Sequence, residues 1–102
     1  MATSVNNYSP AGYVGGTTNR LLITPTSGGS TCTGLSASGV PDGWEVVLYN
    51  VSATIQITFP NASGSSSAAN QFLCPGAGAV VLDVQTGVII QYVAALTAWI
   101  FL

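Results

Sequence analysis

Catalysis in proteins usually depends on charged, thiol or imidazole side chains, and this chain carries few of them. It contains one basic residue, three acidic residues, two cysteines and no histidine. A Ser-His-Asp or Cys-His arrangement therefore cannot be built, and a Ser-Lys pair lacks its lysine. The sequence predicts a protein that is not an enzyme.

The acidic residues are the remaining candidates for acid-base chemistry. Two carboxylates chosen from Asp42, Glu45 and Asp83 could in principle hydrolyse a glycosidic bond. However, Asp42 belongs to a Pro-Asp-Gly turn, Glu45 stands at the start of a strand and Asp83 is alone in another. We therefore predict no catalytic, cofactor-binding or metal-binding residues.

Cys32 and Cys74 are far apart in the sequence and show no CxxC or Cys/His spacing. A metal site would need more ligands than these two thiols. Two interpretations remain open. The cysteines form a disulfide in an oxidising compartment, or they are two buried thiols that stay reduced, which we favour.

The low charge of the chain limits its partners. Only 4% of the residues are charged and the net charge is −2, whereas about 25% is typical. One cation cannot neutralise a row of phosphates, so we predict no nucleic-acid partner, and no polybasic contact with a membrane surface. A surface of Ser, Thr, Asn and Gly is cheap to desolvate, which favours a molecule covered by neighbours.

The chain of 102 residues is long enough for one domain with a single core. Residues 1–16 hold Pro10 and three glycines without a sustained period, which predicts an extended N-terminal arm. The arm is either a tail in solvent or a segment that lies on a neighbouring subunit. Tyr8 and Tyr13 would be its apolar anchors.

Residues 17–102 alternate short apolar runs with turn signals about every 8 to 12 residues, which predicts an all-β domain. We expect a jelly-roll-like, two-sheet antiparallel sandwich of about eight strands. A bend at residues 50–52 would join two of them as a hairpin. The predicted strands cover residues 19–25, 31–37, 44–51, 53–59, 70–73, 79–84, 88–93 and 96–102.

The strand at residues 44–51 is largely apolar on both faces, so we expect both to be covered. One face carries Trp44, Val46 and Leu48, and the other carries Glu45, Val47 and Tyr49. Residues 53–59 alternate more cleanly, with Ile57 and Phe59 on the side predicted to pack.

The apolar run at residues 87–102 is the one candidate for a membrane helix. It is shorter than the roughly 20 residues that a spanning helix needs, and no basic residue flanks it. A pair of strands fits better. The N-terminus lacks a cationic start and an apolar core, so we predict no secretory signal and a protein that stays where it is made.

Several short motifs follow one another in a fixed order along the chain. They are "GWEVVLYN" at 43–50, "IQITF" at 55–59, "SAANQF" at 67–72, the turn Pro75-Gly76, "VVL" at 80–82, Tyr92 and Trp99. This order resembles the small β-domains of tailed-phage virions, which occur as head-decoration, or cement, proteins and as modules of tail fibres and tail tips. The resemblance spans residues 20–99, although Gln71, Ala98 and Ile100 are uncharged where the pattern often has charge.

Residues 62–69 ("ASGSSSAA") form a Ser-rich loop by composition. The resemblance implies a structural role for Asn70, which would cap this loop by bonding backbone groups; a ligand-binding role is the alternative. Trp44 and Trp99 are expected to be core or subunit-interface aromatics. Trp44 could instead belong to a carbohydrate-stacking platform, which would need polar partners beside it.

These features together predict a capsid decoration protein. A homotrimer made in the bacterial cytoplasm would sit on the capsid surface, bind the major capsid protein between capsomers and stabilise the shell against packaged DNA. The arm at 1–16 and the C-terminal strand are the expected joining surfaces. One alternative is a tail-fibre or tail-tip module that binds a host-surface glycan. Another is a secreted carbohydrate-binding module or adhesin.

Overall fold

The computed structural model describes residues 1–27 and 30–102, and these residues form an all-β structure, as predicted. Two short 3-10 turns, η1 (Ala68–Asn70) and η2 (Pro75–Ala77), are the only helical elements among them. The strands are β1 (Ser4–Val5), β2 (Arg20–Ile23), β3 (Ser30–Cys32), β4 (Glu45–Asn50), β5 (Ile57–Phe59), β6 (Phe72–Leu73), β7 (Val80–Leu82), β8 (Gly87–Val93) and β9 (Ala98–Phe101).

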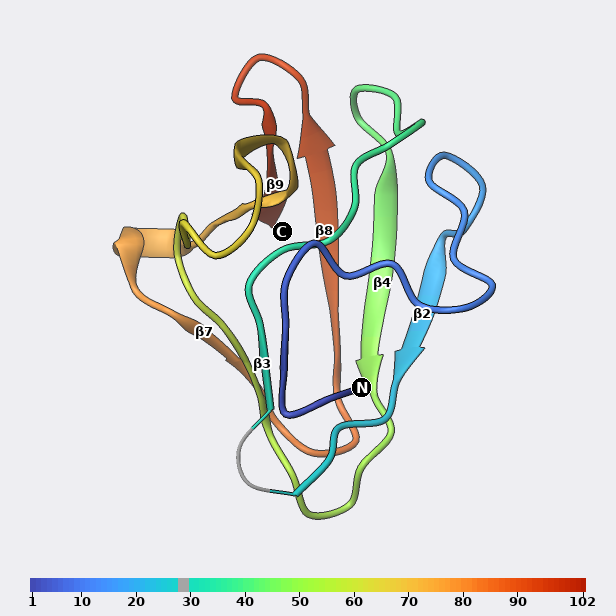
Figure 1. Ribbon diagram of the computed structural model, residues 1–102, viewed down its shortest axis with the longest axis vertical. Coiled ribbons are helices and arrows are strands. Elements are labelled where there is room, and N and C mark those ends of the chain that lie inside the picture. Colours follow the sequence, from blue (N-terminus) through green and yellow to red (C-terminus); the bar gives the residue numbers. More distant parts are fainter. Residues whose placement is uncertain (28–29) are drawn as a thin grey trace.

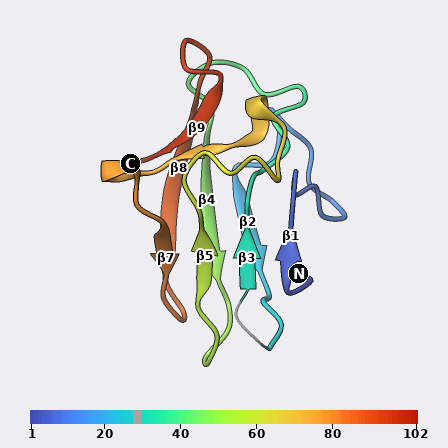
Figure 2. The same cartoon turned by 60° about the vertical axis from the view of Figure 1, so that its left-hand side comes forward.

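The strands form two sheets that pack face to face. The order is β1-β3-β5-β7 in the four-stranded sheet and β2-β4-β8-β9-β6 in the five-stranded sheet. Figure 2 shows the first sheet in front of the second. Each step along the chain from β1 to β8 moves from one sheet to the other, and only β8 and β9 are consecutive neighbours in the same sheet.

The prediction of antiparallel sheets is wrong, because both sheets are mixed. β1–β3, β3–β5, β2–β4 and β6–β9 pair in parallel, while β4–β8, β5–β7 and β8–β9 pair antiparallel. The first half of the chain winds as a coil with one strand per sheet in each turn, so strands of the same sheet run in the same direction. The jelly-roll connectivity is not confirmed.

The predicted hairpin at residues 50–52 is also wrong. β4 lies in the five-stranded sheet and β5 in the four-stranded sheet, so the segment between them crosses from one layer to the other (Figure 1). Asn50 holds this crossing with its side chain. Residues 53–56 are not part of a strand, and β5 begins at Ile57.

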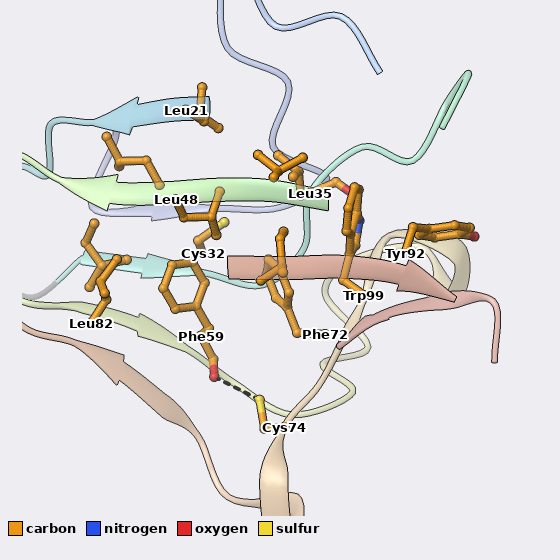
Figure 3. Close-up of a cluster of buried hydrophobic side chains, with 14 residues drawn as sticks. Leu21, Cys32, Leu35, Leu48, Phe59, Phe72, Cys74, Leu82, Tyr92 and Trp99 are labelled. Atoms are coloured by element: carbon orange, nitrogen blue, oxygen red, sulfur yellow. Dashed lines mark hydrogen bonds between the residues drawn. The ribbon is translucent and has the colours of Figure 1, made fainter. Parts of the chain in front are cut away.

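The core lies between the sheets and is drawn in Figure 3. Phe59 of the four-stranded sheet packs edge-on against Phe72 of the other, with ring centroids 5.2 Å apart. Trp99 is fully buried and donates its indole N–H to the Leu35 carbonyl at 2.9 Å. Phe72 and Trp99 are therefore core residues, and for Trp99 this is one of the two roles that the sequence predicted.

The C-terminal run forms the antiparallel pair β8 and β9, which confirms the prediction of two strands. Among the residues that the structure describes, there is no helix with the length and apolarity of a membrane span.

The N-terminal segment lies against its own chain. β1 pairs with β3, and Tyr8 forms a parallel bridge with Leu35. Asn7 fastens the segment, because its side-chain oxygen accepts hydrogen bonds from the Ser67 amide at 2.7 Å and from the Asn70 side chain at 2.8 Å. Tyr8 and Tyr13 both pack against the core of the same chain.

Candidate interaction surface

The side of the five-stranded sheet that points away from the core is the candidate functional surface. Strands β2, β4 and β8 alternate between buried and more exposed residues, and the pairing register aligns their exposed residues in rows. We call this surface the outer face. Its side chains are Arg20, Leu22, Glu45, Val47, Tyr49, Leu73, Ile89, Gln91 and Ile100.

The outer face is apolar at its centre. Arg20, Val47 and Ile89 form one row across three strands, and Leu22 stands beside Tyr49 in the next. Leu22 is 54% exposed and Ile89 is 41% exposed. Large apolar side chains that share one face of a sheet and remain in water are typical of a surface that binds another macromolecule.

Tyr49 and Gly87 form a flat area at one end of this face. They are direct partners on β4 and β8, and a Cβ added to Gly87 would meet the Tyr49 ring at 3.3 Å. The Tyr49 hydroxyl donates to the Gln85 carbonyl at 3.1 Å. The ring is therefore fixed over the glycine, and a partner meets an ordered aromatic surface.

Two of the four charged side chains of the protein are on the outer face, and they have opposite signs. Arg20 and Glu45 line one shallow groove together with Asn19, Gly43, Trp44, Val47 and Ile89. Glu45 accepts a hydrogen bond from the Gln91 side chain at 3.3 Å. Arg20 is exposed, and its guanidinium takes part in none of the hydrogen bonds found between described side chains.

Trp44 lines this groove and has a mainly structural position. Its indole N–H donates to the Thr18 carbonyl at 3.0 Å, and the half-buried ring packs against the core. The polar partners that a carbohydrate platform would need are present, since Arg20, Glu45 and Asn19 line the same groove. The indole N–H itself is already satisfied.

Asn70 links three segments of the chain. Its side-chain oxygen accepts from the Ala37 amide at 2.9 Å, and its nitrogen donates to the Asn7 side chain. It bonds a backbone group, as the resemblance implied, but that group follows β3 rather than ending the Ser-rich loop. The Asn70 side chain therefore links the N-terminal segment to the segment that follows β3.

The carboxylates make separate local contacts. Asp42 accepts from the Ala94 amide at 2.8 Å. Asp83 accepts from the Val84 amide at 2.7 Å and from the Gln56 side chain at 3.2 Å. The hydrogen bond from the Val84 amide has the larger effect, and both bonds lower the pKa of Asp83. No group of three or more potential metal ligands occurs in residues 1–27 and 30–102.

Both cysteines are free, buried thiols. Burial raises the pKa of Cys32 to about 12 and also raises the pKa of Cys74. Each thiol donates to a carbonyl, that of Gly34 for Cys32 and that of Phe59 for Cys74; Figure 3 shows the second bond. Neutral, enclosed thiols are poor nucleophiles.

Sequence reasoning missed the buried Asn50, which was placed in a bend. The side chain is fully buried at the end of β4. It donates to the carbonyls of Ile55, Leu82 and Asp83 and accepts from the Ser52 amide. The signal was present, because Asn50 follows Val46 and Leu48 at the two-residue spacing that points into the core.

Comparison of the chain with protein-family models, with curated proteins and with solved structures found no match.

Proposed function

We propose that this protein is a non-catalytic structural subunit whose outer face is covered by neighbouring subunits, and specifically a capsid decoration protein of a tailed phage. The observation that carries the proposal is the outer face itself, an apolar sheet surface on which Leu22 and Ile89 are exposed. The phage setting comes from the sequence resemblance.

The chemistry of the remaining surface agrees with attachment by many weak contacts. Only 4% of the residues are charged, so contact with neighbours removes few ions from water. Subunits joined to one another engage several positions on a shell at once, and effective concentration then converts weak contacts into tight attachment. A shell whose capsomers are joined by such subunits resists the outward pressure of packaged DNA.

The test compares phage particles made with and without the gene for this chain, imaged by electron cryo-microscopy. We expect deletion to remove density between the capsomers of the head and to make heads rupture at a lower temperature. Restoring the gene with Ile89→Lys should leave the heads undecorated, whereas Val81→Lys, on the four-stranded sheet, should restore decoration. Unchanged, equally stable heads after deletion would overturn the proposal.

A tail-fibre or tail-tip module that binds a host glycan is a second candidate. The groove that brings Trp44 beside Arg20, Glu45 and Asn19 favours it, since an aromatic ring with hydrogen-bonding neighbours suits a sugar. In the same images, density lost from the tail instead of the head would support this function. Quenching of tryptophan fluorescence by host-surface oligosaccharides would then locate the sugar at Trp44.

A further inference from the structure

We propose that the outer face binds a second copy of this chain face to face, with Arg20 of each copy paired to Glu45 of the other. This inference rests on the proposed function, because it names the first neighbour that covers the outer face. It adds the identity of that neighbour and the symmetry of the contact.

The charges of the outer face favour a second copy over a foreign surface. The face carries one cation and one anion, Arg20 and Glu45, in an otherwise apolar and neutral setting. A predominantly acidic or basic partner would satisfy one of these charges and oppose the other. A second copy supplies the complement of both, which makes the face self-complementary.

The positions of the two charges fit a two-fold axis. Arg20 pairs with Val47 across β2 and β4, and Glu45 is two residues before Val47 on the same side of its strand. Arg20 and Glu45 are therefore diagonal neighbours on one face. In a two-fold contact, residue i meets residue j twice, so an axis between the two side chains creates two reciprocal ion pairs.

Apolar contacts surround these pairs. Val47 and Ile89 continue the row that Arg20 begins, so they would be close to the axis in both copies. Leu22 lies two residues beyond Arg20 on the same face and would extend the apolar contact. Two such sheets would pack about 10 Å apart, with their side chains interdigitated.

The size of the face predicts a reversible pair. β8 has seven residues and is about 23 Å long at about 3.3 Å per residue. Four strands spaced by about 4.8 Å are roughly 19 Å wide, which gives a projected area of about 440 Å². This is about half of the roughly 800 Å² per partner of a standard interface. The pair should therefore dissociate on dilution.

Charge reversal in two separate chains tests the proposal most sharply. Arg20→Glu places a second carboxylate opposite Glu45 of the other copy, and Glu45→Arg places a second guanidinium opposite Arg20. Each variant alone should therefore self-associate at least tenfold more weakly than the native chain. A mixture of the two variants should restore pairing to within about threefold, because both ion pairs then form between different chains. Sedimentation velocity over a concentration series measures this.

The control is a mixture of Arg20→Glu with Asp83→Arg. Asp83→Arg changes the net charge by the same amount as Glu45→Arg but lies outside the outer face. A mixed pair with Arg20→Glu would have one ion pair and one pair of opposed carboxylates, so this mixture should not restore pairing as the mixture with Glu45→Arg does. Circular dichroism melts of each variant verify that the fold is intact. Leu22→Lys, which leaves both charges in place, should also weaken pairing at least tenfold.

The outcomes separate this inference from the proposed function. Failure of the mixed variants to pair, or a native chain that sediments as a monomer at millimolar concentration, overturns the two-fold contact. A trimer, which the resemblance implies, also overturns it, because a three-fold ring joins two different patches. If deletion of the gene still removes density from the heads in either case, the proposed function stands. Heads that deletion leaves unchanged and equally stable overturn the proposed function instead.

Discussion

At the scale of single residues, the Asn50 side chain joins the two sheets by hydrogen bonds. Its side-chain amide reaches from the end of β4 to the carbonyls of Ile55, Leu82 and Asp83. These carbonyls belong to the segment before β5 and to the end of β7, in the opposite layer. One buried side chain thus fastens both sheets at the same end of the molecule.

Asn50→Ala should lower the free energy of unfolding by about 2 to 4 kcal/mol, because it leaves buried carbonyls without donors. Urea denaturation followed by tryptophan fluorescence measures the change. Asn19→Ala is the matched control, since Asn19 is exposed, and it should stay within about 0.5 kcal/mol of the native chain. Equal losses for the two variants would show that Asn50 has no special role.

Cys32 should make the fold sensitive to alkali. Burial raises the pKa of its thiol from 9.0 to about 12 in the folded chain. The unfolded chain therefore loses this proton first, and stability that is fully present below pH 9 is lost as the pH rises toward 12. The slope from this one group approaches about 1.4 kcal/mol per pH unit.

Urea denaturation at several pH values between 8 and 11 tests this, using Cys32→Ala as the comparison. We expect the variant to be less stable at pH 8 but to lose stability less steeply above pH 9. Tyr13, whose pKa burial raises to about 12, leaves a residual fall in both proteins. If the free energy of unfolding falls with pH equally steeply in the two proteins, the role of Cys32 is contradicted.

At the scale of elements, Gly34 determines how closely the Ser-rich loop approaches the end of β3. A Cβ at this position would lie 2.5 Å from the Ser66 side-chain oxygen and 2.6 Å from the Asn70 carbonyl oxygen. The Asn70 oxygen is backbone, so it cannot turn away. Only glycine allows the loop, η1 and β3 to meet here.

Gly34→Ala should therefore destabilise the fold by about 1 to 3 kcal/mol through overpacking. Gly64→Ala makes the same chemical change where no atom lies within 4 Å, and it should be close to neutral. Thermal melts of both variants provide the measurement. A Gly34→Ala protein as stable as Gly64→Ala would mean that the loop and β3 separate easily.

The N-terminal segment should depend on Asn7. Its side chain bonds Ser67 and Asn70, and its φ of 47° is a left-handed conformation that Asn tolerates better than Ala. Asn7→Ala should therefore loosen β1. We expect at least tenfold faster hydrogen exchange at the Thr31 and Thr33 amides, which bond the carbonyls of Thr3 and Val5.

The Tyr92 amide, which bonds the Trp44 carbonyl just before β4, serves as the internal control for that experiment. Its exchange rate should not change beyond the effect of global stability. Uniform acceleration at all three amides would show that the segment unfolds only with the whole domain. Protection that stays constant at Thr31 would show that Asn7 does not hold β1.

The sequence predicted most strands but not their partners. Two-residue alternation correctly identified Ile57 and Phe59 as inward residues. It also placed Val46 and Leu48 on one face of their strand, and that face is the buried one. The neighbours of a strand depend on the connections. Residues 50–52 were expected to form a hairpin bend. Instead, the Asn50 side chain donates to the Ile55 carbonyl and the Ser52 hydroxyl accepts from the Ile55 amide, so the chain crosses to the other sheet. After this crossing, β5 pairs in parallel with β3.

The candidate surface was only partly visible in the sequence. The apolar second side of residues 44–51 predicted that something covers Val47 and Tyr49, and within the chain both remain only half-buried. The position of Arg20 next to Glu45 could not be predicted, because it depends on the parallel pairing of β2 with β4. Sequence reasoning instead predicted joining surfaces at the arm and the C-terminal strand.

At the scale of the whole molecule, the two sheets differ in what they offer to a partner. The N-terminal segment supplies β1, which is the edge strand of the four-stranded sheet and pairs with β3. The five-stranded sheet presents the outer face, where the side chains are apolar and the charges are balanced. A protein with 4% charged residues stays in solution more easily if such a face is covered.

The central claim is that a second copy covers the outer face, and a dilution series followed by methyl NMR tests it most directly. The account predicts that the methyl signals of Leu22, Val47 and Ile89 shift together with one dissociation constant as the protein is diluted. Those of Val81 and Leu96, which are 52% and 54% exposed elsewhere on the molecule, should not move. Constant signals at Leu22 and Ile89 across the series, or shifts confined to Val81 and Leu96, would contradict it.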